Sequence, residues 1–194
     1  MNIRNFEDRD ILDVCKISHL VWGDLYKKES LAVQKIIYNF TVEYYDLNRE
    51  FSLICEDDGL KGFILAAKKE DAKDLYQKLL SQIQNNFSKN EQKVILDLYE
   101  YLDYCGKLVK AKMTSNDIMM GLFVSVQKGV GKSLLNRLSE ICIAKGMKNI
   151  YLWTDTTCDY DYYNKNNFEL VQKVDKIVNG RKLLTQIYKK SVEI

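Results

Sequence analysis

The sequence predicts an α/β fold in which a central sheet carries helices on both faces. Stretches with the apolar spacing of amphipathic helices alternate along the chain with short apolar runs typical of strands. Two dipeptides with a strong hairpin preference, Asp58-Gly59 and Asn179-Gly180, each separate two such runs. The chain has 194 residues, 46% of them hydrophobic, which suits a single domain spanning residues 1–194.

The first part of the chain is expected to contain a short strand, two helices and a hairpin. The strand lies near Ile3, and apolar spacing predicts the helices at about 8–26 and 33–47. The hairpin strands flank Asp58-Gly59.

A helical insertion is expected at about residues 69–106. Helical spacing covers residues 69–87, and Ser88 with Glu91 forms a capping-box pattern that begins a second helix. Gly106 is the expected end of that helix. The apolar stripes show only that each helix buries one face, so the insertion would form either a wall over a site or a dimer surface.

The rest of the chain is expected to alternate strands and helices, and Gly146 marks one helix end. The expected elements are a buried strand at 117–125, a helix at 130–145, a strand at 149–154, a short helix at 158–165 and strands at 168–178 and 181–189.

Composition disfavours several classes of protein. Lys and Arg number 29 and Asp and Glu 27, and the resulting net charge of +2 argues against a nucleic-acid partner. No stretch approaches the roughly 20 apolar residues of a membrane span, and the N-terminus lacks a signal peptide. Five cysteines without a close pair and a single histidine argue against a metal site. We therefore expect a reduced, cytoplasmic protein without a metal.

The turn that leads from the 117–125 strand into the next helix is the most informative stretch. Gly129 and Gly131 allow unusual backbone angles and a close approach to a ligand. The free N–H groups at a helix start suit phosphate, and Lys128 and Lys132 add positive charge there. The stretch predicts a site for an anion such as a pyrophosphate, with an unliganded strand-to-helix turn as the alternative.

A nucleotide P-loop is a second interpretation of the same turn. Gly131-Lys132-Ser133 matches the end of the GxxxxGK[ST] pattern. Val126 stands where the first glycine belongs, so we favour this interpretation less.

The chain resembles the GNAT family of acetyl-CoA-dependent N-acetyltransferases. The family's [Q/R]xxGx[G/A] signature falls on Gly129 and Gly131, with Val126 in the polar first position and Gln127 one place later. The resemblance is clear over about residues 117–190 and does not cover the insertion.

The downstream part of the resemblance is a Y-x-x-x-G-F pattern. Tyr163 to Phe168 fits it with Asn167 in the glycine position, and asparagine is the best non-glycine residue where φ is positive. The segment 154–160, TDTTCDY, is similar to a family variant in which asparagine stands at the place of Asp159.

The resemblance implies a mixed, mostly antiparallel sheet and transfer of an acetyl group from acetyl-CoA to a primary amine by direct attack. Backbone groups of Leu122 and Val124 would hydrogen-bond the pantetheine arm, and Tyr163 would protonate the leaving thiolate. The residues implied in binding acetyl-CoA are Leu122, Phe123, Val124, Gln127, Lys128, Gly129, Val130, Gly131, Lys132, Ser133 and Cys158.

The group that takes the proton from the amine has three candidates. Asp117 at the start of the central strand is placed first, and Asp155 and His19 are the others. Direct attack needs no covalent acyl-enzyme, so Cys158 is expected to be an apolar filler.

The acceptor is expected to be a small-molecule or peptide amine: a polyamine, an aminoglycoside, an amino acid and a protein N-terminus all stay open. A homodimer is also an option. The competing functions are an acyl-CoA-binding module without chemistry and a P-loop-like nucleotide-binding protein.

Overall fold

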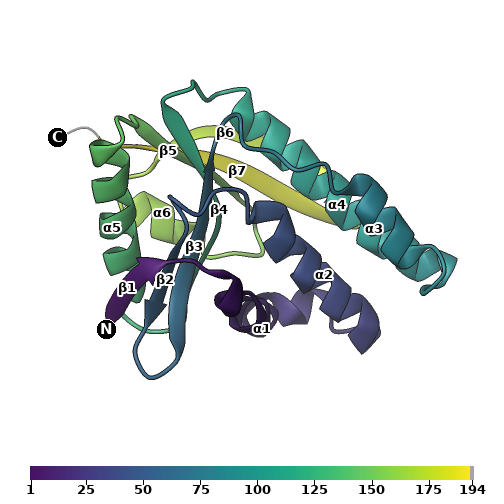
Figure 1. The fold of residues 1–194 in the computed structure, drawn as a ribbon. Coiled ribbons are helices and arrows are strands. Elements are labelled where there is room, and N and C mark those ends of the chain that lie inside the picture. The colour runs from purple at the N-terminus through teal and green to yellow at the C-terminus, as the bar shows by residue number, and fades with distance from the viewer. Residues whose placement is uncertain (193–194) are drawn as a thin grey trace.

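The computed structural model describes residues 1–192 and has one seven-stranded sheet with helices on both faces (Figure 1). The strand order is β1-β2-β3-β4-β5-β7-β6. The strands are β1 (Asn2–Asn5), β2 (Leu53–Glu56), β3 (Leu60–Lys68), β4 (Asp117–Ser125), β5 (Asn149–Thr154), β6 (Glu169–Val178) and β7 (Arg181–Ser191). Only β4 and β5 pair in parallel, and the five other pairs are antiparallel, which confirms the predicted mixed, mostly antiparallel sheet.

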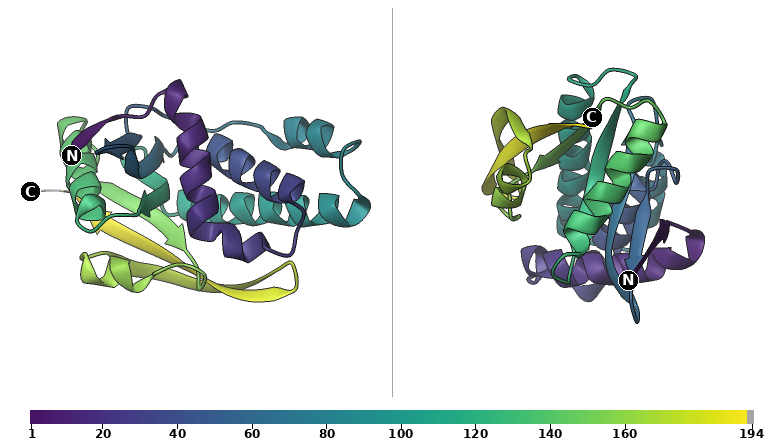
Figure 2. Two further views of the ribbon diagram at one scale, coloured as in Figure 1. Left: turned by 90° about the horizontal axis from the view of Figure 1, so that it is seen from below. Right: turned by 90° about the vertical axis from the view of Figure 1, so that its left-hand side faces the viewer.

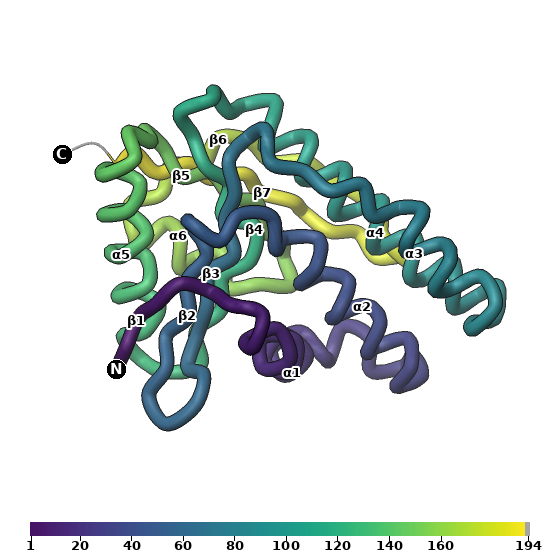
Figure 3. The backbone as a smooth tube through the Cα atoms, viewed as in Figure 1, coloured from purple at the N-terminus to yellow at the C-terminus, as the bar shows by residue number. Residues whose placement is uncertain are grey.

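The helices follow the predicted order. They are α1 (Ile11–Trp22), α2 (Leu31–Tyr45), α3 (Tyr76–Ile83), α4 (Lys89–Lys110), α5 (Val130–Ala144) and α6 (Asp161–Lys165), with 3-10 turns at Asp8–Asp10 and Gly23–Tyr26. In the backbone trace of Figure 3, α5 lies at the left of the molecule, whereas α3 and α4 lie at the right. No helix within residues 1–192 is long and apolar enough to cross a bilayer.

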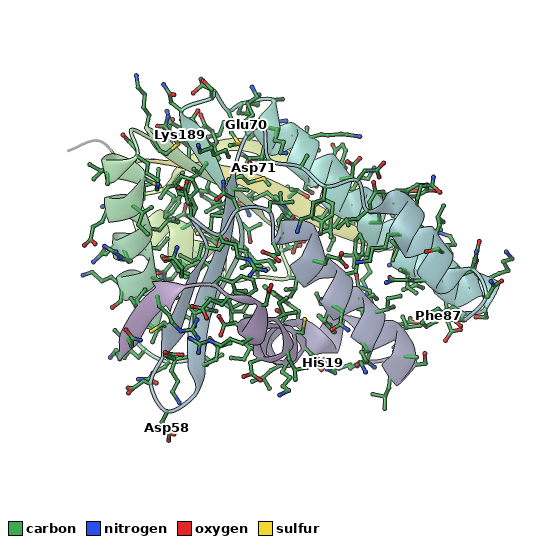
Figure 4. The ribbon with its side chains drawn as sticks, in the orientation of Figure 1. His19, Asp58, Glu70, Asp71, Phe87 and Lys189 are labelled. Carbon is green, nitrogen blue, oxygen red and sulfur yellow. The ribbon has the colours of Figure 1, made fainter. Side chains whose placement is uncertain are left out.

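The predicted insertion differs from the structure at both ends. Residues 69–75 are not helical, because the Asp71 carboxylate accepts hydrogen bonds from the Lys68 N–H and from Asn48 and holds a turn there. The second helix continues through Gly106, since the next turn buries Val109 completely. Phe87 lies in the turn between α3 and α4, at the tip farthest from α5 (Figure 4).

The hairpin turns form where the sequence predicts them. Asp58 and Gly59 have φ of 52° and 95°, and Asp58 extends from the tip of the β2–β3 hairpin (Figure 4). Asn179 and Gly180 have φ of 49° and 72° between β6 and β7. The β6–β7 hairpin runs alongside α4 (Figure 2).

The sheet separates two hydrophobic cores. In β3, Phe63 and Leu65 pack with residues of α1, α2 and α4, whereas the alternate residues Ile64 and Ala66 pack with α5. Both faces of the central strands are therefore buried, which explains why β3 and β4 are almost continuously apolar.

β4 and β5 part soon after they begin. Their pairing ends at Met119 and Tyr151, after which β4 stays with β3 and β5 with β7. The register of β4 against β3 shifts at Gly121, which forms a bulge. A Cβ on Gly121 would lie 2.0 Å from the Tyr45 ring, so only glycine fits at this point. The parted strand ends are the feature from which the site is built.

Candidate functional site

A cavity of about 1050 Å³ lies beside the parted ends of β4 and β5. One end, here called the turn end, is formed by β4 after Gly121, the turn 126–129 and the start of α5. The other end, here called the aromatic end, lies among α1, α2, α4 and the turn between β6 and β7. The cavity therefore connects the predicted anion site with a chamber beneath the helices.

The backbone of β4 presents unpaired groups to the cavity. The Val126 N–H donates to the Lys61 carbonyl oxygen at 2.9 Å. Because residues alternate in an antiparallel ladder, Val124 and Leu122 also turn their N–H and C=O groups toward β3. The intervening residues Phe123 and Ser125 turn their N–H and C=O groups toward the gap between the parted ends of β4 and β5. This corrects the expectation for Leu122 and Val124, which line the cavity with side chains instead.

The start of α5 forms the turn end of the cavity. Gly129 caps the helix with a φ of 89°, as its predicted turn requires. The Gly131 N–H donates to Ser125 Oγ at 3.1 Å. A Cβ on Gly131 would lie 3.1 Å from Tyr162 Oη and 3.2 Å from Phe123, so this position is tightly enclosed.

Most of the predicted binding residues line the turn end, and two do not. Gln127, Lys128, Gly129, Gly131 and Lys132 line the cavity, as do Leu122, Phe123, Val124 and Cys158. Val130 and Ser133 do not: Val130 is buried in the core beneath α5, and Ser133 is outside the lining.

Two tyrosines of α6 border the cavity. Tyr162 packs against Phe123, and its hydroxyl is buried without a hydrogen-bond partner within residues 1–192. Tyr163 packs against Phe168 and Tyr188, and burial raises the pKa of its phenol above its usual value. The Tyr163 hydroxyl is therefore a proton donor at neutral pH.

The residue in the glycine position after these tyrosines has the expected conformation. Asn167 has a φ of 60°, and the Phe168 N–H returns to the Tyr163 carbonyl at 3.1 Å. This turn fixes α6 against β6.

Aromatic side chains form most of the other end. Tyr38 donates its hydroxyl to the Trp22 carbonyl at 2.8 Å, and Trp153 Nε1 donates to Tyr45 Oη at 3.0 Å. Burial raises the pKa of Tyr26 to about 12. The aromatic residues at this end are Trp22, Tyr26, Tyr38, Tyr45, Tyr101 and Trp153.

The helical insertion forms a wall of the cavity. Val94, Leu98, Tyr101 and Leu102 of α4 line it. Of the two roles left open by the sequence, the structure places α4 over the site.

Asp155 is buried at the aromatic end, just after β5, and is only 5% exposed. Its Oδ1 accepts hydrogen bonds from the Thr157 N–H at 2.8 Å and the Thr157 hydroxyl at 2.5 Å. Its Oδ2 accepts one from Tyr101 at 2.9 Å. Asp155 is thus the one candidate proton acceptor that the structure brings to the cavity.

Asp117 does not reach the cavity, which corrects its placement as the first catalytic base. It lies at the opposite end of β4, where it accepts hydrogen bonds from the N–H and hydroxyl of Thr114 and from Asn149. This carboxylate connects the first residues of β4 and β5 and does not face the cavity.

His19 also lies outside the cavity lining. It belongs to α1, and its ring hydrogen-bonds Gln34 at 3.0 Å and stacks on Tyr38, both of α2 (Figure 4).

Cys158 lines the cavity, but burial and the nearby Asp155 charge raise the pKa of its thiol. The thiol stays protonated, so it is a weak nucleophile, in agreement with the expected filler role.

Sequence reasoning missed Tyr101 and Arg181. Tyr101 continues the helical stripe of Leu98 and Cys105, so its burial could have been found. Its partner, Asp155, lies 54 residues away, and no local pattern signals that contact. Arg181 comes to the cavity only because the β6–β7 hairpin turns back over it.

Solved structures with the same fold are N-acetyltransferases. No protein-family model and no curated protein sequence matches the chain. An aminoglycoside 6′-N-acetyltransferase complexed with coenzyme A superposes with a TM-score of 0.59 at 16% identity, covering 100% of this chain and 98% of that one. The aminoglycoside 6′-N-acetyltransferase of Enterococcus faecium gives 0.56 at 16% identity, with 100% and 98% covered. A GCN5-related N-acetyltransferase from Rhodopseudomonas palustris gives 0.54 at 12% identity, with 98% and 94% covered. The chain has the GNAT fold.

Proposed function

We propose that this chain, which has the GNAT fold, transfers an acetyl group from acetyl-CoA to a primary amine. The observation that carries the proposal is the cavity at the parted ends of β4 and β5, which joins a helix start suited to pyrophosphate with an aromatic chamber. Tyr163 lines the cavity as well.

The residues of the turn end fit a nucleotide thioester. The buried Tyr162 hydroxyl, which lies beside Gly131, has no hydrogen-bond partner within residues 1–192 and offers one to a polar group of a ligand. The positive end of the α5 dipole, together with Lys128 and Lys132, favours a pyrophosphate at this end. The gap-facing backbone of Phe123 and Ser125 offers hydrogen bonds to the amide groups of a pantetheine arm.

The backbone of β4 and the side chain of Tyr163 then have separate roles in the acetyl transfer. Acetyl-CoA supplies the thioester carbonyl that the amine attacks. An N–H of β4 that faces the gap polarises that carbonyl, as in an oxyanion hole. Tyr163 is the proposed acid for the leaving thiolate: burial raises the pKa of its phenol, so the proton is present at neutral pH when the C–S bond breaks.

The structure gives little support to a P-loop. A P-loop requires its serine hydroxyl at the metal-bound nucleotide, and Ser133 does not line the cavity. A binding module without chemistry has the same cavity, and only turnover separates it from an enzyme.

Thermal shift and thiol release test the proposal. At about 100 times its dissociation constant, a ligand adds about 2.7 kcal/mol of stability, which a melting curve resolves. We expect acetyl-CoA and CoA to raise the melting temperature and Mg-ATP to leave it unchanged. With amines added, free thiol should appear from acetyl-CoA in proportion to enzyme. Stabilisation by Mg-ATP alone would refute the proposal, and binding of acetyl-CoA without thiol release would identify a binding module.

A further inference from the structure

Resting on the proposed acetyl transfer, we propose that Asp155 binds the ammonium group of the acceptor and that Tyr101 positions Asp155. The acceptor is then an amine with a single positive charge on an apolar or aromatic body, not a polyamine or an aminoglycoside. The observations behind this are the hydrogen bonds of Asp155, the aromatic walls around it and the balance of charge along the cavity.

Asp155 has capacity for one further donor. Its Oδ1 accepts two hydrogen bonds from Thr157 and its Oδ2 accepts one from Tyr101. A carboxylate accepts about four, so Oδ2 has room for another. All three donors are neutral, and a carboxylate that is 5% exposed is costly to bury without a cation. An ammonium group in the cavity would supply both the missing donor and the missing charge.

Tyr101 orients the Asp155 carboxylate and so determines on which side Oδ2 can accept a further hydrogen bond. Its hydroxyl lies 2.9 Å from both Asp155 Oδ2 and Thr185 Oγ1. Because a phenol has one hydrogen, which it gives to the carboxylate, Thr185 donates to Tyr101. The chain from Thr185 through Tyr101 to Asp155 joins β7, α4 and the end of β5. Tyr101 thereby holds the carboxylate in place.

The surfaces around Asp155 are apolar and aromatic. Tyr101 and Trp153 meet edge to face at 5.2 Å, and Tyr26 and Tyr38 at 6.4 Å. Ring faces of this kind attract a cation and pack against an apolar body. The apolar residues beside them are Leu25, Ile37, Val94, Leu98, Leu102 and Leu183.

The charges along the cavity disfavour a polycation. Three carboxylates line it, of which only Asp155 is fully buried. Four cationic side chains line it as well. The carboxylates are Glu29, Asp155 and Asp159, and the cations are Lys28, Lys128, Lys132 and Arg181. Lys128 and Lys132 belong to the turn end, so an acceptor at the aromatic end meets only Lys28 and Arg181 among the described cationic side chains of the lining. An acceptor with several ammonium groups would have to bury the additional ones against apolar and aromatic walls, whereas a single ammonium is matched by Asp155, the one buried carboxylate of the described lining.

The same contact prepares the amine for attack. The amine attacks as the free base, so the ammonium group must give up a proton, and Asp155 Oδ2 is the acceptor in contact with it. An N–H bond of the ammonium breaks, an O–H bond forms at Asp155 Oδ2, and the electron pair left on nitrogen attacks the thioester carbonyl. The C–S bond then breaks, and the thiolate takes the proton of Tyr163. The nitrogen loses its second proton as the amide forms, and that proton restores the Tyr163 phenol. The proton leaves Asp155 to solvent after the product departs.

Calorimetry with benzylamine tests the ammonium contact independently of turnover. Benzylamine is titrated into the CoA-saturated protein, its Asp155→Asn variant and a matched control, Asp161→Asn. Asp161 is an exposed carboxylate of α6 that does not line the cavity. We expect Asp155→Asn to weaken benzylamine binding by at least about tenfold and Asp161→Asn to change it by less than about twofold. Equal binding to the Asp155→Asn variant and the unmodified protein would overturn the proposal.

Two kinetic comparisons complete the test. Tyr101→Phe keeps the ring and removes the hydrogen bond, so the KM for benzylamine should rise several-fold while kcat changes much less. A merely structural role would lower the stability of the protein without this division between KM and kcat. Benzylamine should also be preferred over spermidine and kanamycin, and a preference for either polycation would overturn the proposed acceptor class.

The outcomes separate this inference from the proposed function. If no amine releases thiol but benzylamine binding still depends on Asp155, acetyl transfer is wrong and the ammonium site stands. If amines release thiol and the Asp155→Asn variant keeps the KM of the unmodified protein, acetyl transfer stands and the ammonium site is wrong.

Discussion

Replacing Gly121 by alanine should destabilise the protein, because the bulge of β4 leaves no room for a side chain. The added Cβ would lie 2.0 Å from Tyr45 Cδ1, 2.5 Å from Cε1 and 2.8 Å from Cγ. Ordinary contact begins near 3.4 Å, so the ring would have to withdraw by about 1.4 Å. Tyr45 is only 2% exposed and cannot withdraw freely.

The size of the effect follows from two costs. Overpacking a filled core costs about 1–3 kcal/mol. Moving the ring also stretches the hydrogen bond from Trp153 Nε1 to Tyr45 Oη, now 3.0 Å, at about 1 kcal/mol. We therefore expect the free energy of unfolding to fall by about 2–4 kcal/mol, which shifts a urea midpoint by roughly 1–2 M.

Urea unfolding followed by tryptophan fluorescence measures this change, and Gly106→Ala is the control. Gly106 lies inside α4, and a Cβ there would meet only Tyr44 Oη at 3.5 Å. Alanine at this position should therefore raise the free energy of unfolding by about 0.5–1 kcal/mol. Replacing glycine by alanine is thus expected to destabilise the protein at position 121 and to stabilise it at position 106. In a Tyr45→Leu background, Gly121→Ala should cost much less. A loss below about 1 kcal/mol for Gly121→Ala alone would refute the steric argument.

Four further predictions concern the site and the fold. Tyr163→Phe should lower kcat by about 10²–10⁴-fold while acetyl-CoA affinity, measured by calorimetry, stays within about threefold; an unchanged kcat would remove Tyr163 as the acid. Cys158→Ala should keep kcat within about threefold, and loss of turnover would indicate a covalent step. Asn167→Ala should cost about 1 kcal/mol in urea unfolding because φ is 60°, whereas Asn167→Gly should be nearly neutral; equal effects would contradict a conformational cause. Burial alone would raise the pKa of Asp10, but hydrogen bonds from Arg4 and a backbone N–H outweigh it and lower that pKa. A carboxylate with a lowered folded-state pKa stabilises at neutral pH and loses this contribution as pH falls through that pKa. Asp10→Asn should therefore cost about 1–3 kcal/mol at pH 7, and its deficit should narrow below roughly pH 4; a deficit independent of pH would contradict the ion pair with Arg4.

Sequence patterns predicted the elements whose stability is local or whose burial is uniform. β4 and β5 have the bounds expected from their apolar runs, because both faces of each strand are covered. The Asp58-Gly59 and Asn179-Gly180 turns follow from backbone preferences alone. Residues 69–75 were predicted wrongly because Asp71 is engaged by Asn48, a contact that helical spacing does not signal.

The candidate site likewise has one part that the sequence predicts and another that it does not. The turn end depends on glycines and on a helix start, which a short motif shows. Asp117 was misplaced because a nine-residue strand is about 26 Å long from its first to its last Cα, so its two ends serve different parts of the molecule. The motif fixed one end of β4 and said nothing about the other.

The two ends of the cavity should respond separately to substitution. In the proposed function the turn end binds acetyl-CoA mainly through backbone groups of β4 and the dipole of α5, so it should depend on chain conformation more than on side-chain identity. The aromatic end depends on side chains from several separate segments, and the hydrogen-bond chain through Tyr101 joins α4 and β7 to Asp155. Changes at Tyr101 or Asp155 should therefore alter which amine binds and leave acetyl-CoA affinity unchanged. The helical insertion lies outside the stretches that resemble the GNAT family, and under the proposed ammonium site its Tyr101 would make the choice of acceptor depend on a segment that the resemblance does not cover.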